Sequence, residues 1–380
     1  MDFKELFESE KRIIGLDIIR TYAILSVVLG HGNYLFPIEF RPYFAIPCFI
    51  DGVSIFFVLS GFLIGNIIIK NILTKGEFNF STLYDFLFRR WMRTLPNYFL
   101  ILLLLIIIDF KSWNYNFKFL LFLQNLTSSP PGFFGVSWSL SVEEWFYFLF
   151  PFSFFLFYKL FPASKEKLYL IILVLFLIFP LVLRWISINN GVSDFDSSIR
   201  KVVIYRLDSM MYGILGSYIF YKFNLVWRKY SKFYLLISLI LLFPLLIYHV
   251  SGWFGMGILD GLSVLKRSIF IFNYESLCVL FLLPFLSNLH RFKVSFLNKI
   301  FAFLSKISYS MYLVHGSLVL WLITPKIHSY LETTKLNFLQ ISIINNLIYI
   351  GLTLFFSLIL YLCFEKPLLN WRDKKHLLNN

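Results

Sequence analysis

Two ionisable side chains in the first long apolar segment could do chemistry together. Arg20 and His31 are eleven residues apart, which at about 100° per residue is three helical turns plus roughly 20°, so both would lie on one helix face. Asp17 lies roughly 60° from Arg20. An ionisable group inside a membrane-spanning helix costs about 2.5–3.5 kcal/mol and usually faces a cavity or a partner. The spacing therefore predicts a polar stripe of Asp17, Arg20 and His31 that lines an aqueous passage.

A second interpretation of this stripe is purely structural. Asp17 and Arg20 would pair locally and reach toward the cytoplasmic surface, and His31 would cap the other end of the helix. Arg20 lies several residues inside the apolar segment, however, where such groups usually line a pore. We therefore expect the cavity-lining arrangement.

Two adjacent carboxylates, Glu143 and Glu144, follow a serine-rich stretch that contains Trp138. Ser141 and Glu144 fit a capping box at a helix start, and tryptophan suits a membrane interface. A cap needs one carboxylate, and two are present. If this helix begins at the side where the first helix ends, both glutamates share a half of the bilayer with His31. A carboxylate beside a histidine fixes its tautomer and makes it more basic, which suits proton abstraction from a hydroxyl.

Three arginines, Arg89, Arg90 and Arg93, precede Tyr98 at the expected inner mouth of the third span. An ordinary basic cytoplasmic loop would look the same. Closely spaced arginines could equally bind phosphates in a bidentate manner, which lysines do less well. We interpret this cluster as a candidate site for a phosphorylated ligand.

Further polar residues are candidates for lining an acceptor cavity. Taken alone, each fits a satisfied structural pair or a core residue as well. They are Asp17, Asp51, Ser60, Trp138, Arg206, Asp208, Tyr309 and His315. The six histidines and three cysteines show no metal-ligand spacing, so we expect no metal.

The composition places the chain in a membrane. Hydrophobic residues make up 58% of the 380 residues and charged residues 15%, and the mean hydropathy is +0.74. Such a chain has too little polar surface for a soluble globule. The formal charge of +14 does not indicate nucleic-acid binding, because the basic residues lie between apolar runs instead of on a soluble face.

Apolar runs of membrane-spanning length predict an all-α polytopic protein with about ten helices around a central cavity. The predicted spans are 15–35, 50–69, 95–109, 143–161, 168–187, 203–221, 233–250, 268–286, 300–323 and 345–364. The apolar stretch 117–126 is too short to cross and is predicted to be interfacial or re-entrant. We expect one transmembrane domain over 1–380 with no appended soluble domain.

Charge asymmetry orients these spans. The segments at one side hold about twice as many Lys and Arg residues as the alternating segments. The positive-inside rule then puts both termini in the cytoplasm and His31 near the outer face.

Six motifs, in sequence order, carry a resemblance to a known family. They are Gly15-Leu16-Asp17-x2-Arg20-x10-His31, Gly52-Val53-x2-Phe56-Phe57-Val58-Leu59-Ser60-Gly61, Arg89-Arg90-x2-Arg93-x2-Pro96-x-Tyr98, Ser137-Trp138-Ser139-Leu140-Ser141-Val142-Glu143-Glu144, Arg206-Leu207-Asp208 and Ser308-Tyr309-Ser310-x-Tyr312-Leu313-x-His315. Together they resemble the acyltransferase-3 family of membrane acyltransferases over nearly the whole chain.

The resemblance implies a bacterial inner-membrane enzyme of the stand-alone type. Its donor would be acyl-coenzyme A, with acetyl-coenzyme A as the expected form. Its acceptor would be a hydroxyl of a surface glycan, such as lipopolysaccharide, or of a lipid-linked sugar. Apart from donor, acceptor and membrane lipids, no partner is implied. The family's essential arginine and histidine fall on Arg20 and His31, and Glu143 and Glu144 would complete the catalytic set.

Two positions depart from the family pattern. Much of the family has Gly-Val-Asp where this chain has Gly52-Val53-Ser54, with an acid instead at Asp51. The ninth-helix motif often runs His-x-Pro, whereas this chain has His315-Gly316-Ser317. The role of the displaced acid is open at this point.

The resulting hypothesis is that Arg89, Arg90 and Arg93 hold the phosphates of acyl-coenzyme A while its arm passes Arg20. His31, oriented by Glu143 or Glu144, would then act as a base or carry the acyl group. The alternative is a transporter or flippase that uses the same charges without covalent chemistry. Transporters usually show repeated halves with broken helices in matching positions, which this sequence lacks.

Overall fold

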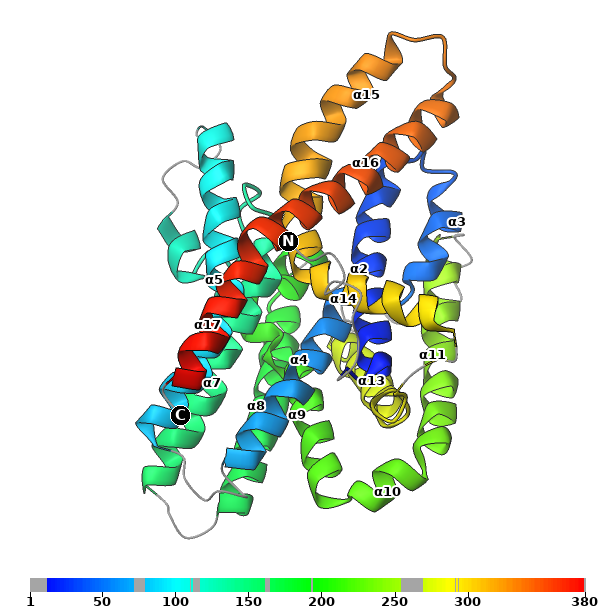
Figure 1. The fold of residues 1–380 in the computed structure, drawn as a ribbon. Helices are drawn as coiled ribbons and strands as arrows, with labels where there is room; N and C mark the ends of the chain where they lie inside the picture. The colour runs from blue at the N-terminus through cyan, green and yellow to red at the C-terminus, as the bar shows by residue number, and fades with distance from the viewer. Residues whose placement is uncertain are drawn as a thin grey trace.

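The computed structural model describes residues 12–71, 79–109, 111, 117–160, 165–192, 194–253, 269–290, 292 and 294–378 (Figure 1). These residues form helices and no strands, which confirms the predicted all-α class. The α-helices of eight or more residues are α2 (Ile14–Gly32), α4 (Gly52–Ile69), α5 (Phe80–Ile108), α7 (Ser137–Leu160), α8 (Lys165–Asn189), α9 (Leu207–Lys222), α11 (Ser231–Trp253), α13 (Ile271–Ser287), α14 (Ser295–Val314), α15 (Thr324–Glu332), α16 (Phe338–Leu360) and α17 (Lys366–Leu378).

Shorter helical segments connect these elements or interrupt them. Two are short α-helices and four are 3-10 turns: α3 (Arg41–Ala45), α10 (Asn224–Lys229), η1 (Asn33–Leu35), η2 (Ile46–Cys48), η4 (Phe117–Leu121) and η6 (Val203–Tyr205). Three are π-helical: η5 (Asp196–Arg200), η7 (His315–Ile323) and η8 (Tyr361–Glu365).

Eight helices among the described residues are long and apolar enough to cross a membrane. Each of the ten predicted spans overlaps a helix. The two that fall short of the length needed are α9, with 16 residues, and α13, with 17. The stretch 117–126 forms only the η4 turn. The chain is thus a polytopic membrane protein, as its composition predicts.

Several helices begin or end well outside the predicted apolar spans. α5 begins at Phe80, because the Asn79 side chain caps it by accepting from Thr82 N–H at 2.9 Å. α7 begins at Ser137, and the ninth helix continues from α14 through η7 into α15. Hydropathy marks the apolar part of a helix and misses its polar ends. The arginine cluster therefore lies within α5, not in a loop at its mouth.

α4 and α9 pack backbone against backbone. A Cβ at Gly61 would lie 2.0 Å from Met210 O, and a Cβ at Gly213 would lie 2.0 Å from Val58 O. Small residues at a helix crossing permit such an approach within a membrane. This contact fixes α4, which lies against α2 and α7 as well.

The first span, α2, is enclosed by α4, α14 and α16. Thr21 Oγ1 donates to Phe301 O at 3.3 Å, and Tyr349 Oη donates to Val28 O at 3.1 Å. One end of the bundle carries α3 and α15 (top in Figure 1) and is called the α15 end here; the opposite end carries α10 and is called the α10 end. α2 runs toward the α15 end, so His31 lies near that end and Arg20 lies deeper.

Candidate active site

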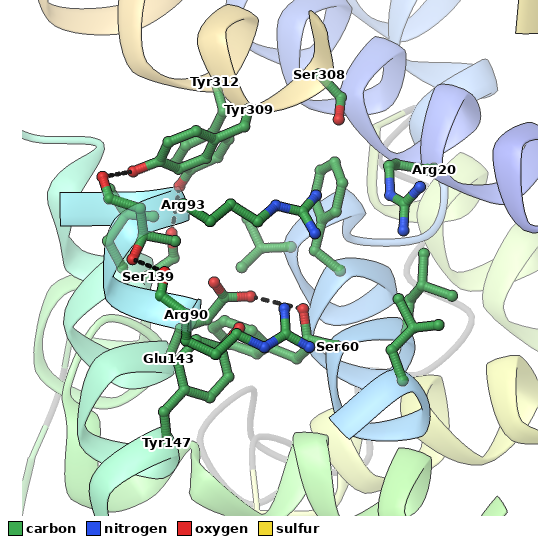
Figure 2. A pocket seen from close by; sticks show the side chains of 17 residues that line it. Arg20, Ser60, Arg90, Arg93, Ser139, Glu143, Tyr147, Ser308, Tyr309 and Tyr312 are labelled. Carbon is green, nitrogen blue, oxygen red and sulfur yellow. Dashed lines mark hydrogen bonds between the residues drawn. The ribbon is translucent and has the colours of Figure 1, made fainter. Parts of the chain in front are cut away.

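A cavity called the inner cavity lies among α2, α4, α5, α7 and α14 (Figure 2). Its polar lining comes from all five helices: Arg20, Ser60, Arg90, Arg93, Thr94, Ser139, Glu143, Tyr147, Ser308, Tyr309 and Tyr312. Figure 2 shows Arg20 of α2 reaching into the same space as Arg90 and Arg93 of α5. The sequence prediction that Arg20 faces a cavity agrees with this placement.

The inner cavity carries an excess of positive charge. Three arginines and one glutamate line it. Arg20 donates to Ser305 Oγ at 3.0 Å and lies 3.7 Å from Asp17, but Asp17 also pairs with Arg12. Arg90 lies over the Tyr147 ring, 5.4 Å from its centroid. An anion would offset the charge of these guanidinium groups, and arginine suits phosphate in particular.

The two glutamates do not orient His31 as expected. Ser60 Oγ donates to Glu143 Oε1 at 3.0 Å, and Thr94 Oγ1 donates to Glu144 Oε1 at 2.7 Å. Because α7 begins at Ser137, the glutamates lie about 9 Å inside the helix instead of at its first turn. The capping-box interpretation is wrong for the same reason, since Ser141 lies inside the helix.

A second cavity, called the outer cavity, opens near the α15 end and has a volume of about 520 Å³. Its polar and aromatic lining includes His31, Asp51, Trp138, Arg200 and Glu275. Its size falls within the roughly 300–1,000 Å³ of small-ligand pockets. His31 is therefore accessible to a ligand from this end of the bundle.

His31 contacts a second histidine, His315, across the interface of α2 with the π-helix η7. His31 Nδ1 and His315 Nε2 are 2.9 Å apart, and the rings stack with centroids 5.1 Å apart. The His315 side chain is fully buried. It replaces the carboxylate that the sequence analysis expected beside His31.

The hydrogen bonds of His315 determine which nitrogen of His31 is free. His315 Nδ1 lies 2.7 Å from Tyr312 O and 3.1 Å from Met311 O. Carbonyl oxygens only accept, so this Nδ1 carries the proton and, in the neutral ring, Nε2 carries a lone pair. His31 must then donate from Nδ1, which leaves the lone pair of its own Nε2 available. Nε2 of His31 makes no hydrogen bond with the residues that the structure describes.

The two cavities share two lining residues, Val53 and Tyr312. Tyr312 Oη lies 2.6 Å from Ser139 Oγ and donates to Val136 O at 3.0 Å. The inner cavity has a volume of about 80 Å³. Val53 and Tyr312 therefore lie where the two cavities meet.

The displaced acid Asp51 belongs to a charged network beside the outer cavity. It caps α4 by accepting from Val53 N–H at 3.1 Å and pairs with Arg200 at 3.2 Å. Burial alone would raise the pKa of Asp51, but Arg200 and Arg206 outweigh this effect and hold it below the usual value. Ser54 donates to the buried Glu275 at 2.7 Å. A carboxylate from α13 thus contacts Ser54, the position at which the resemblance predicts an acid.

Seven predicted site residues line neither cavity: Asp17, Glu144 and His315, whose contacts are given above, and Arg89, Tyr98, Asp208 and Arg206. Arg89 is exposed on α5, and Tyr98 is buried with its hydroxyl on Phe119 O at 2.9 Å. Asp208 pairs with the buried Arg184 at 2.7 Å. Arg206 is buried and donates to Ser54 at 3.0 Å. Arg90 and Arg93 are therefore the members of the arginine cluster that face a cavity.

Residues that the sequence analysis did not single out also belong to this region. Glu275 and Glu365 are both buried, and Ser310 Oγ donates to Glu365 at 2.5 Å. Each glutamate lies in or beside a predicted apolar span, so the cost of an intramembrane charge could have identified both. Tyr312 gives no such signal, since tyrosine is common in membrane helices.

Two kinds of comparison with known proteins gave no match, and a third gave one. A family model described as an acyltransferase domain, that of acyltransferase family 3, matches residues 13–362. No curated protein and no solved structure matches the chain.

Proposed function

Because the chain belongs to the acyltransferase-3 family of membrane acyltransferases, we propose that it moves an acyl group from acyl-coenzyme A to a hydroxyl. The proposed acyl group is acetyl, and the proposed acceptor is a cell-surface glycan or a lipid-linked sugar. The observation that carries this proposal is that Nε2 of His31 makes no hydrogen bond within the part of the chain that the structure describes. His31 Nδ1 lies 2.9 Å from His315 Nε2, which assigns the lone pair to Nε2 of His31, and His31 lines a cavity of about 520 Å³. Acyl transfer to a hydroxyl requires such a base or nucleophile.

The donor is proposed to enter from the α10 end, which the positive-inside rule makes cytoplasmic in a bacterial inner membrane. Both termini would then be cytoplasmic. Arg90 and Arg93 would bind its phosphates, and Arg20 would line the path of the arm. The inner cavity, at about 80 Å³, is too small for the donor, so Tyr312 and the arginine side chains must move when it binds.

In the proposed step, an acceptor hydroxyl oxygen attacks the thioester carbonyl while His31 Nε2 takes the hydroxyl proton. The carbon–sulfur bond breaks, and the coenzyme A thiolate receives that proton from the imidazolium. The products are the ester and free coenzyme A. The Nδ1–H bond to His315 would hold the ring in place throughout.

A two-step route uses the same atoms. His31 Nε2 attacks the thioester, carries the acyl group and passes it to the acceptor oxygen, whose proton ends on the thiolate. Rapid quenching of the enzyme with labelled acetyl-coenzyme A and no acceptor separates the routes. Label retained on the protein, and absent from a His31→Ala variant, identifies the carrier.

The proposal is tested with purified protein and radiolabelled acetyl-coenzyme A. We expect His31→Ala to lower transfer to a glycan acceptor about 10²- to 10⁴-fold, the range of general acid–base catalysis. His290→Ala is the matched control, because His290 is exposed beyond α13. Normal transfer by His31→Ala, or no turnover of acetyl-coenzyme A by the unmodified protein, would contradict the proposal. The second result would favour a transporter.

A further inference from the structure

A third cavity lies beside the outer cavity at the base of α15. Its volume is about 680 Å³, and Tyr34 lines both cavities. In Figure 1, α15 and the start of α16 project beyond the neighbouring helices at this end. This lateral cavity is defined by Tyr34, Glu39, Arg41, Trp321, His328 and Asn345.

Aromatic rings lead from this cavity to His31. Tyr34 stacks with His31 at a centroid distance of 6.5 Å, and Trp321 lies 6.4 Å from Tyr34. Both aromatic side chains are 58% exposed. Both rings are thus partly exposed, and Tyr34 connects the lateral cavity to His31.

Tyr34 and Trp321 form an aromatic platform, and the segment that carries Tyr34 is held in place before any ligand binds. Arg41 donates to Phe36 O at 2.9 Å, and its guanidinium lies 5.7 Å from the Tyr34 ring centroid. Asn33 donates to Arg41 O at 3.0 Å, and Asn346 of α16 donates to Gly32 O at 2.8 Å. Preorganisation of this kind lowers the entropic cost of binding.

Polar groups line the same cavity. Asn345 is 1% exposed, and its Oδ1 has no hydrogen-bond partner among the described residues. Glu39 and Arg41 add a carboxylate and a guanidinium. A lipid tail would leave Asn345 Oδ1 unsatisfied, whereas a hydroxyl of a ligand would donate to it.

We propose that the lateral cavity binds a pyranose ring of a carbohydrate, stacked on Trp321 and Tyr34 with hydroxyls on Asn345. Sugar rings present apolar C–H faces to aromatic rings and hydroxyls at their edge, which matches this lining. The inference rests on the proposed function only in that the bound sugar would be the acceptor, or the residue next to the acylated one.

The test is equilibrium dialysis of the full-length protein in detergent with tritiated methyl glycosides of glucose, galactose, mannose and N-acetylglucosamine. We expect at least one to bind, and Trp321→Ala to raise its Kd about three- to tenfold. Trp185→Ala, at a tryptophan of α8 that is 56% exposed, should leave that Kd unchanged and serves as the control. Asn345→Leu should weaken binding as well.

Binding of none of the glycosides, or an equal Kd for Trp321→Ala and Trp185→Ala, would overturn the inference. A parallel arm uses the same sugars linked to a short isoprenyl phosphate. If the lipid-linked sugars bind more tightly than the methyl glycosides and this binding still depends on Trp321, the aromatic platform is supported and the natural ligand is identified as a lipid-linked sugar. This test measures sugar binding in the absence of acetyl-coenzyme A. If acyl transfer alone failed, the proposed function would be contradicted, but sugar binding to the lateral cavity would still be supported.

Discussion

The central group of the site is a histidine whose tautomer is fixed by another histidine. Two backbone carbonyls of α14 accept a hydrogen bond from His315 Nδ1–H, so His315 Nε2 is left to accept from Nδ1–H of His31. A neutral partner orients the ring as a carboxylate would but places no negative charge beside it. We therefore propose His315 as a positioning residue that acts through His31.

Replacing His315 should impair turnover without affecting donor binding. We expect His315→Ala to lower kcat about 10²-fold or more, because His31 loses the acceptor of its Nδ1 proton. The KM for acetyl-coenzyme A should stay unchanged, since the inner cavity lies beyond Tyr312. Steady-state kinetics with labelled donor measures both constants.

The conservative variant distinguishes positioning from packing. The amide oxygen of His315→Gln can accept from His31 Nδ1, so this variant should recover part of the lost kcat. Equal losses in the alanine and glutamine variants, or a raised donor KM in both, would show that His315 only fills space.

Among the helices, the π-helical segments coincide with the charged and imidazole groups. η7 begins at His315, η5 ends at Arg200 and η8 ends at Glu365. π-Helical turns are rare and frequently occur at functional sites. The sequence did not predict these π-helical segments, because one wide turn changes the spacing of apolar residues in a membrane helix only slightly.

The contact of α4 with α9 sustains the position of Ser60 and of the α4 cap at Asp51. Gly213→Ala would place a Cβ 2.0 Å from Val58 O, so the helices must separate. We expect a lower thermal unfolding temperature and a smaller monodisperse peak in size-exclusion chromatography.

Gly351→Ala is the matched control for this prediction. Nothing lies within 4 Å of a Cβ at Gly351, and alanine in a helix is favoured over glycine by about 0.5–1 kcal/mol. This variant should be as stable as the unmodified protein or slightly more so. Equal behaviour of the two variants would mean that α4 and α9 do not pack in this way.

Over the whole molecule, two cavities lie in series, with Arg20, Arg90 and Arg93 in one and His31 in the other. Val53 and Tyr312 line both. The proposed donor binding and the proposed chemistry would thus be separated along the bundle axis, and a side-chain motion at Tyr312 would join the two cavities.

The sequence predicted the membrane spans and the placement of Arg20, because apolar length and the cost of a buried charge are local properties. It did not predict the partner of His31. His315 is 284 residues away, and its contact depends on how η7 packs against α2. The sequence also placed Glu143 and Glu144 at the start of a helix, because the polar first residues of α7 carry no hydropathy signal. Glu275 could have been found by the criterion applied to the first span.

The most direct test of the central claim is transfer across a sealed membrane. Protein is reconstituted into proteoliposomes of known orientation, with labelled acetyl-coenzyme A at the α10 end and a glycoside acceptor enclosed at the α15 end. The arrangement predicts labelled ester on the enclosed acceptor, reduced about 10²- to 10⁴-fold by His31→Ala. Transfer that occurs only when donor and acceptor are on the same side would contradict it.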